Sequence, residues 1–456
     1  MNENDKTISQ RLSRWAVSME PEDLPQPAVE KIRDILVDIV GLCIAARNED
    51  YIEATKAAAE PGDQVIIGHP DRVSPSSAAL INGTAAHGED FDDTFEGGPV
   101  HSGVVMVPAL LAAAQTHGLT NDRVVLGMAT GAELLCRLAL TLPKGVHKAG
   151  FHPTAVLGVF GATLGICSAC RASEEVAANA LGIAGSMASG IIEYLGDGSW
   201  TKRMHPGWAA QSALRAYAMA QAGFIGPKAV FEGTHGVFNV FASSIEPRPE
   251  QLFKELGTRW VTETIALKPY PCGSMIQPYI DCAIQLKQRR VSLEGLEAVV
   301  CKTAEGIVHR LWEPLELKRQ PPTAYAAKFS TPFGIALGLI RGQAGLQDYS
   351  EAAIRDNNLL TICRLVDFEI DPDDPYPDIF TGHIRLVYAD GRFEEVEQGF
   401  VRGGMEHPLS RQEIDDKFRA NVAFGGSDEA ERVLDVCEQI GYRQGDYRLI
   451  ETLANV

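Results

Sequence analysis

The sequence predicts a mainly α-helical protein, with a large all-helical domain and a smaller α+β lid domain. Three observations indicate this class. The first half is rich in Ala, Leu and Gly at helical spacing. From about Lys268 to Phe400, short segments alternate apolar and polar residues, as strands do. The residues after about 402 return to a helical pattern, so we expect residues 1–266 plus 402–456 to form the helical domain and 267–401 the lid.

Length and composition limit the classes of protein to which this chain can belong. The 456 residues suffice for two or three domains, and a hydrophobic fraction of 45% with 22% charged residues is ordinary for a soluble globular protein. A net charge of −19 argues against general binding to nucleic acid or to acidic membranes. No apolar run reaches membrane-spanning length, and Met1–Thr7 is not signal-like. Nine scattered cysteines suit reduced thiols, so we expect a cytoplasmic protein.

The predicted helices follow the spacing of apolar residues along the first half. Ser9–Met19 is amphipathic, and apolar residues then recur at helical spacing from Val29 to Cys43. The next helices share an Ala, Leu and Gly-rich composition: Ala78–Ala86, Val104–Thr116, Val124–Leu140, Ala155–Cys170 and Ala177–Tyr194. The CxxC pair Cys167 and Cys170 lies inside one of them and indicates core packing. No strand precedes a Gly-rich turn here, which excludes dinucleotide-binding and P-loop sites.

The lid is predicted from its strands. Glu297–Thr303 and His383–Ala389 alternate in polarity, and a turn at Asp390 and Gly391 leads into Phe393–Val396 as a hairpin. Between these strands Thr331–Leu339 is helical, and the acidic, Pro-rich Asp367–Asp378 indicates a surface loop.

A capping box marks the return to helix. Ser410 is the predicted N-cap, and Glu413 stands at the third helical position. The helices that follow would rejoin the first domain.

The stretch from His87 to Gly103, called here the acidic loop, is the first candidate site. It holds four carboxylates in five residues, with a histidine at each side: Glu89, Asp90, Asp92, Asp93, His87 and His101. Carboxylates this close repel one another, and burying them without partners is costly. Since the loop separates two apolar helices, it is a candidate for proton transfer. An acidic turn whose Asp side chains cap a helix and face water explains it equally well.

Basic residues cluster at three places in this acidic chain. The clusters are Lys144, His147, Lys148 and His152; Lys202, Arg203 and His205; and the single Lys268. A pocket combining them with the acidic loop would bind a small polycarboxylate, because Lys and Arg would neutralise its carboxylates while His101 and His152 shuttle protons. For any one of these residues alone, a surface or structural role remains the alternative.

Six motifs in order resemble those of the MmgE/PrpD family. They are Asp90-Phe-Asp-Asp-Thr, His101-Ser-Gly, Gly150-Phe-His-Pro-Thr, Thr201-Lys-Arg-Met-His-Pro-Gly, Lys268-Pro-Tyr-Pro and Ala327-Lys-Phe-Ser-Thr-Pro-Phe. The resemblance implies a helical domain with an α+β lid, a homodimer, and no metal or organic cofactor. It implies 2-methylcitrate dehydration, cis-aconitate decarboxylation or epimerisation of iminodisuccinate, and the chain looks most similar to the epimerase.

The same resemblance assigns the site residues. Those that match the decarboxylase's active site are Asp90, His101, His152, Lys202 and Lys268. Phe333 stands where the decarboxylase has a tyrosine and cannot donate a proton. The chain also has one extra residue between Asp90 and His101. Both differences weaken the decarboxylase interpretation.

For an epimerase, His152 and Lys202 are the predicted acid–base pair, with Arg203 the cationic neighbour that would lower the pKa of Lys202. His101 and Lys268 would hold carboxylates, and Asp90 would orient a histidine or share a proton. The predicted substrate-binding residues are Lys268, Arg203, His205 and Phe333. The two domains are expected to meet at Lys268.

Three alternatives stay open. A dehydratase-like or decarboxylase-like lyase uses the same residue types. A metal-dependent hydrolase would use the four carboxylates and two histidines of the acidic loop as ligands. A non-catalytic helical binding module would leave the basic turns without a role.

Overall fold

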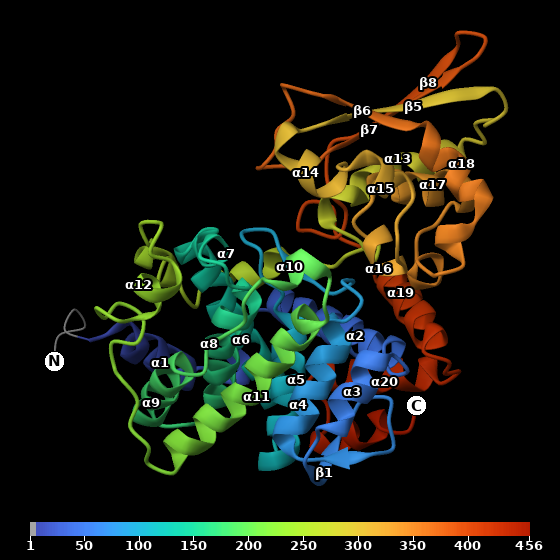
Figure 1. Ribbon diagram of the computed structural model, residues 1–456. Coiled ribbons are helices and arrows are strands. Elements are labelled where there is room, and N and C mark those ends of the chain that lie inside the picture. The colour runs from blue at the N-terminus through green and yellow to red at the C-terminus, as the bar shows by residue number, and fades with distance from the viewer. Residues whose placement is uncertain (1–5) are drawn as a thin grey trace. The chain divides into compact units, whose positions relative to one another are not determined.

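The structure is a computed structural model that describes residues 6–456, and it divides the chain into two units. Unit 1 comprises the chain up to Gly88 together with Asp92–Leu267 and Ser410–Val456. Unit 2 comprises Glu89–Phe91 and Lys268–Leu409. The chain returns to unit 1 at 410 rather than 402, and three residues of the acidic loop belong to unit 2. The mainly α-helical class is confirmed (Figure 1).

Unit 1 is built almost entirely from helices. They are α1 (Ile8–Ser18), α2 (Gln26–Ala45), α3 (Asp50–Ala57), α4 (Pro75–His87), α5 (Gly103–His117), α6 (Asn121–Thr141), α7 (Gly145–Lys148), α8 (Pro153–Ala169), α9 (Glu174–Gly185), α10 (Tyr194–Asp197), α11 (Thr201–Gln221), α12 (Val237–Phe241), α19 (Arg411–Phe424) and α20 (Ala430–Gly441). Two short antiparallel pairs accompany the helices: β1 (Pro61–Val65) with the nearby β2 (Arg72–Val73), and β3 (Thr94–Phe95) with β4 (Ile265–Ala266), which is distant in the sequence.

Helices α5, α6 and α8 are buried around nearly their whole circumference, as their apolar composition predicts. Helices α6 and α8 approach closely at Gly131 and Gly161, because a Cβ added to Gly161 would lie 2.6 Å from the Gly131 carbonyl oxygen. Contrary to our expectation, α6 is long and apolar enough to cross a membrane, but 94% of its most apolar 18-residue stretch is buried. Its hydropathy therefore fits a core helix.

The C-terminal helices pack on α2. Helix α19 begins with the predicted capping box, in which Ser410 accepts from the Glu413 amide and the Glu413 side chain accepts from Ser410. Lys417 of α19 forms a buried ion pair with Asp38 of α2 at 2.7 Å. Burial raises the pKa of Asp38 to about 6 despite the Lys417 charge.

The helix predicted over Ala177–Tyr194 is too long, since α9 ends at Gly185. The chain turns there, and Gly190 adopts a φ of +118° that favours glycine. The Gly190 carbonyl accepts a hydrogen bond from the His152 amide at 2.8 Å. This segment therefore leaves the helix to hold the start of α8.

Unit 2 contains a four-stranded sheet with the order β6–β5–β7–β8. Strand β5 (Leu296–Thr303) pairs antiparallel with β7 (Gly382–Tyr388), and β7 forms the predicted hairpin with β8 (Phe393–Gln398). Strand β6 (Val366–Ile370) is parallel to β5. The surface loop predicted over Asp367–Asp378 is therefore wrong at its start, where the backbone completes the sheet.

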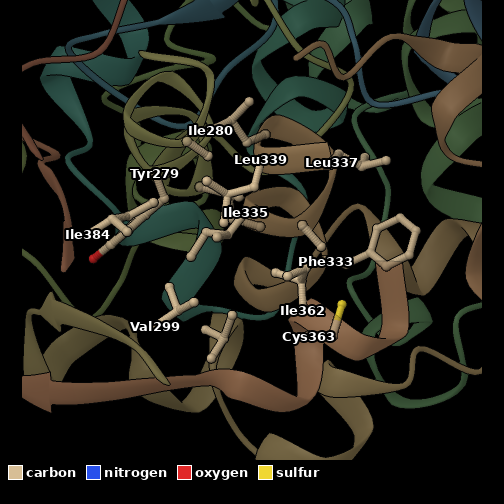
Figure 2. Close-up of a cluster of buried hydrophobic side chains, with 14 of the residues drawn as sticks. Tyr279, Ile280, Val299, Phe333, Ile335, Leu337, Leu339, Ile362, Cys363 and Ile384 are labelled. Carbon is tan, nitrogen blue, oxygen red and sulfur yellow. The ribbon is translucent and has the colours of Figure 1, made fainter. Parts of the chain in front are cut away.

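The helices of unit 2 are α13 (Gln277–Gln288), α14 (Val308–Leu311), α15 (Leu315–Arg319), α16 (Ala324–Ala327), α17 (Thr331–Arg341) and α18 (Asn357–Leu365). Helix α17 packs against α13 and α18, and α13 contacts β7. Their apolar side chains meet those of the strands in one core. Figure 2 shows Ile335 and Leu339 of α17 beside Ile280 of α13, with Val299 of β5 in the same cluster.

Candidate active site

The acidic loop runs from the end of α4 at His87 to the start of α5 at Gly103. Asp93 caps α5: its carboxylate accepts from the backbone amides of Ser102 and Gly103, both at 2.9 Å, and from the Ser102 hydroxyl at 3.0 Å. The helix-capping alternative is thus correct for Asp93, but the carboxylate is buried instead of facing water. Burial raises the pKa of Asp93, and the neighbouring Asp92 charge adds to the rise.

Asp92 joins two histidines. Its Oδ2 lies 3.0 Å from Nδ1 of His87 and 2.9 Å from Nδ1 of His101. Burial alone would raise the pKa of Asp92, but the charges and hydrogen bonds of the two imidazoles hold it well below its usual value. Asp92 is therefore an ionised acceptor, and each Nδ1 donates to it.

A second hydrogen bond also fixes the tautomer of His101. Its Nδ1 lies 2.7 Å from the backbone carbonyl oxygen of Asp93, which can only accept a hydrogen bond. Nδ1 of His101 therefore carries the hydrogen, and Nε2 keeps its lone pair in the neutral ring.

His152 and His205 complete the group of imidazoles, called here the histidine cluster (His87, His101, His152 and His205). His152 is the N-cap of α8, and His205 lies near the start of α11. Their Nδ1 atoms are 3.2 Å apart, so one ring donates to the other. The ring of His152 stacks on His87 with centroids 5.6 Å apart, and His87 and His101 are 5.0 Å apart.

Close helix packing and one side-chain hydrogen bond assemble the cluster. Helix α11 approaches α4 at Gly207, where an added Cβ would lie 2.2 Å from the Leu80 carbonyl oxygen. A Cβ on Gly83 would lie 2.4 Å from Cα of Gly207. The backbone amide of His101 donates to the Thr154 hydroxyl at 3.1 Å, which ties the acidic loop to α8.

Three of the four rings are neutral at neutral pH. Burial lowers the pKa of His87 and of His205 to about 4, and it lowers that of His152 well below its usual value. The positive charge of Lys202 adds to all three shifts, which places its side chain near the cluster. Helices α5, α8 and α11 all begin here, so their positive dipole ends add to Lys202. Neutral bases beside positive charge suit an anionic substrate.

The structure thus brings together four of the predicted residues: His101, His152, His205 and Lys202. Arg203, next to Lys202 at the start of α11, has its guanidinium 4.3 Å from the centre of the Tyr51 ring. Lys144 and Lys148 of the first basic cluster are exposed.

For two residues, Asp92 and His87, the place in the structure differs from what the sequence predicted. Orienting a histidine was predicted for Asp90, but Asp92 does this. His87 was considered as part of the acidic loop and as a possible metal ligand, but it was not among the predicted site residues, yet its ring lies inside the cluster. The available signal was that His87 ends a helix five residues before Asp92.

Asp90 and Lys268 lie in unit 2, where they contact each other. Lys268 Nζ donates to the Asp90 backbone carbonyl at 2.8 Å and lies 3.5 Å from its Oδ1. Asp90 has a φ of +56°, a left-handed conformation that Asp tolerates better than most residues. Lys328 likewise binds the carboxylate of Glu89 and, at 2.8 Å, its carbonyl.

Phe333 is fully buried in the core of unit 2 (Figure 2). Its ring lies 5.9 Å from that of Tyr349, and the same core contains Ile362 and Cys363. These contacts give Phe333 a packing role, and its substrate-binding role remains a prediction.

Among the described residues, the possible metal ligands that come together are His87, Asp92 and His101, whose ligand atoms lie within 4.8 Å of one another. The three residue types suit a transition metal. The other predicted ligands have different partners: Asp93 caps α5, and Glu89 and Asp90 contact lysines. Nδ1 of both histidines already donates to Asp92, so the arrangement is hydrogen-bonded without an ion.

Comparison with known proteins identifies the family. Residues 10–250 match the MmgE/PrpD N-terminal domain, and residues 270–440 match the MmgE/PrpD C-terminal domain. Cis-aconitate decarboxylase of Aspergillus terreus is 25% identical over 460 residues, covering 93% of this chain and 90% of that protein. A cis-aconitate decarboxylase-like protein of Aspergillus oryzae is 24% identical, covering 90% of each chain. The cis-aconitate decarboxylase of Homo sapiens is 23% identical, covering 92% of this chain and 88% of that protein. The resemblance seen in the motifs is confirmed, and the chain belongs to the MmgE/PrpD family.

Proposed function

We propose that this protein is a cofactor-independent enzyme that moves a proton at the carbon next to a carboxylate, and that it epimerises iminodisuccinate. One observation carries the proposal: three buried, neutral imidazoles beside Lys202, at the starts of three helices. Since the relatives are named as decarboxylases, epimerisation of this substrate is the more specific part of the proposal.

The proposed step uses one neutral base and one cationic acid. His152 removes the Cα–H and becomes an imidazolium, while the electron pair moves into the adjacent carboxylate as an enediolate. Lys202 then gives a proton to the opposite face of the carbon and becomes a neutral amine. Proton exchange with solvent then returns His152 to the neutral imidazole and Lys202 to the ammonium form. Lys202 and the helix N-termini would stabilise the enediolate charge before the proton returns.

A decarboxylase acting on cis-aconitate is the second candidate, because the relatives reported above carry that name. That reaction breaks a C–C bond, releases CO2 and needs an acid to protonate the resulting carbanion. It does not need a neutral base. The lowered pKa values of the cluster, together with Phe333 in place of tyrosine, favour proton abstraction over decarboxylation.

Proton NMR in D2O separates the reactions. Purified protein is incubated with single stereoisomers of iminodisuccinate, with 2-methylcitrate and with cis-aconitate. We expect deuterium to enter Cα of iminodisuccinate as the other stereoisomer appears. Loss of water from 2-methylcitrate or of CO2 from cis-aconitate as the fastest reaction would replace the epimerase with a lyase. Epimerisation without deuterium uptake would overturn the carbanion mechanism.

The proposal includes a homodimer in the cytoplasm, as the family resemblance implies. Light scattering of the purified protein gives the mass in solution and would contradict the dimer if it matched a single chain.

A further inference from the structure

We propose that Asp92 is a positioning residue that holds His87 and His101 as one pair, with both Nδ1 atoms protonated and both Nε2 atoms available. This deepens the proposed function, because it names the residues that prepare the bases of that site.

The first step of the argument is the shared acceptor. One oxygen of Asp92 accepts from two rings, at 3.0 Å from His87 and 2.9 Å from His101. The side chains of Asp92 and His87 have no exposed surface. The carboxylate therefore cannot turn to water, and it fixes the tautomer of each ring.

The second step concerns the opposite ring nitrogens. Nε2 of His87 is buried and has no hydrogen-bond partner among the described residues. A buried ring nitrogen with a free lone pair is available to a bound molecule. His101 presents the same atom from a side chain that is 13% exposed, because its Nδ1 is also bound to the Asp93 carbonyl.

Nitrogen NMR of protein labelled with 15N-histidine tests this without any substrate. Signals are assigned with His87→Gln and His101→Gln variants. We expect both rings in the Nδ1–H form near neutral pH. An Nε2–H ring at either position would overturn the pairing.

The Asp92→Asn variant tests the positioning role. Its amide carries no negative charge to hold the two Nδ1–H groups, so we expect His87 to populate the Nε2–H form more than in the wild type, while the Asp93 carbonyl keeps the Nδ1–H form of His101. We expect kcat to fall by about 10²–10⁴-fold, the range of a lost general base, with little change in KM. Asp71→Asn, at an exposed ion pair with Lys56, is the matched control.

If Asp92→Asn does not fold, the wild-type spectra still decide the tautomers of His87 and His101. Wild-type kcat in a folded Asp92→Asn would overturn the positioning role. Absence of turnover on every substrate would count against the proposed function and leave the NMR result standing, so the two failures are distinguishable.

Discussion

The two halves of the acidic loop contain the same residue types but contact opposite kinds of partner. Asp92 and Asp93, in unit 1, accept from imidazoles, a hydroxyl and backbone amides. Glu89 and Asp90, in unit 2, contact the ammonium groups of Lys328 and Lys268. The difference lies in the local charge. Beside the lysines each carboxylate is neutralised, whereas Asp92 keeps a negative charge beside rings that can become positive.

This difference indicates that the two halves of the acidic loop have different roles. A charge left uncompensated next to a base stabilises the cation that the base forms, so the Asp92 half suits proton movement. A lysine held by a carboxylate and a backbone carbonyl has a fixed position, so the Asp90 half suits holding a charged group in place. The predictions below, ordered by expected effect, would break or sharpen this contrast.

The largest effect is expected at the histidine cluster. His152→Ala and Lys202→Ala should each lower kcat by about 10²–10⁴-fold, the usual contribution of a general acid or base, and change KM little. Initial rates of Cα–H exchange, followed by NMR, measure both constants. His235→Ala and Lys254→Ala, at exposed positions, are the controls. A kcat near that of the wild type would remove the mutated residue from its role and make His101 the next candidate.

Lys268→Ala should act on binding. Losing one charge-assisted interaction costs about 1.5–3 kcal/mol, which lowers kcat/KM by about 10–100-fold, mostly through KM. Asp90→Asn is the matched comparison, because it keeps the carbonyl that Lys268 contacts at 2.8 Å, and we expect a smaller loss. A fall in kcat alone would place Lys268 with the proton-moving residues and weaken the contrast between the two halves.

Phe333→Tyr tests whether restoring the family's tyrosine restores decarboxylation. The ring is fully buried, so the added hydroxyl should cost about 1–3 kcal/mol of unfolding free energy for want of a partner. We expect no release of CO2 from cis-aconitate. Chemical denaturation gives the stability, with Phe329→Tyr at a half-buried ring as control. CO2 release by the variant would show that this position selects the reaction.

A smaller effect is expected on the free energy of unfolding as the pH changes. The folded pKa of His87 and of His205 is about 4, below the unfolded value of about 6.5. Below pH 6.5 the unfolded chain binds more protons at these rings, so their contribution is complete above that pH and is lost as the pH falls towards 4. Asp38, with a pKa raised to about 6, has the opposite sign and offsets part of the loss.

The net loss between pH 7 and 5 should therefore be about 1 kcal/mol or more, since one pKa unit corresponds to about 1.4 kcal/mol. Denaturation at several pH values measures it. His205→Gln should flatten the curve on the acid side, and an unchanged curve would contradict a neutral, buried His205.

Much of this fold follows from local patterns. The capping box at Ser410 and the hairpin at Asp390–Gly391 are decided by neighbouring residues, and both were predicted. Strand β6 was missed because pairing with β5, far away in the chain, makes it a strand. The helix after Ala177 was extended too far because Ala and Gly-rich spacing continues beyond Gly185, where the backbone turns towards α8.

The residue types of the site could be predicted from the sequence, but which carboxylate contacts which histidine could not. Basic turns and ordered motifs indicate His101, His152, Lys202 and His205. Which carboxylate of the acidic loop contacts the histidines depends on the backbone at Asp90, whose positive φ redirects the chain before Asp92. Residue order alone does not contain that turn, so Asp90 was predicted to do what Asp92 does.

The smallest effect is expected from removing metal ions. Oδ2 of Asp92 already accepts from two Nδ1–H groups, and an ion binding at those nitrogens would have to displace both hydrogens. Dialysis against a strong chelator should therefore leave the exchange rate unchanged, and rate measurements before and after dialysis decide this. A rate that is lost and then restored only by a divalent cation would make His87, Asp92 and His101 a metal site. Both halves of the acidic loop would then hold cations, and the contrast between them would disappear.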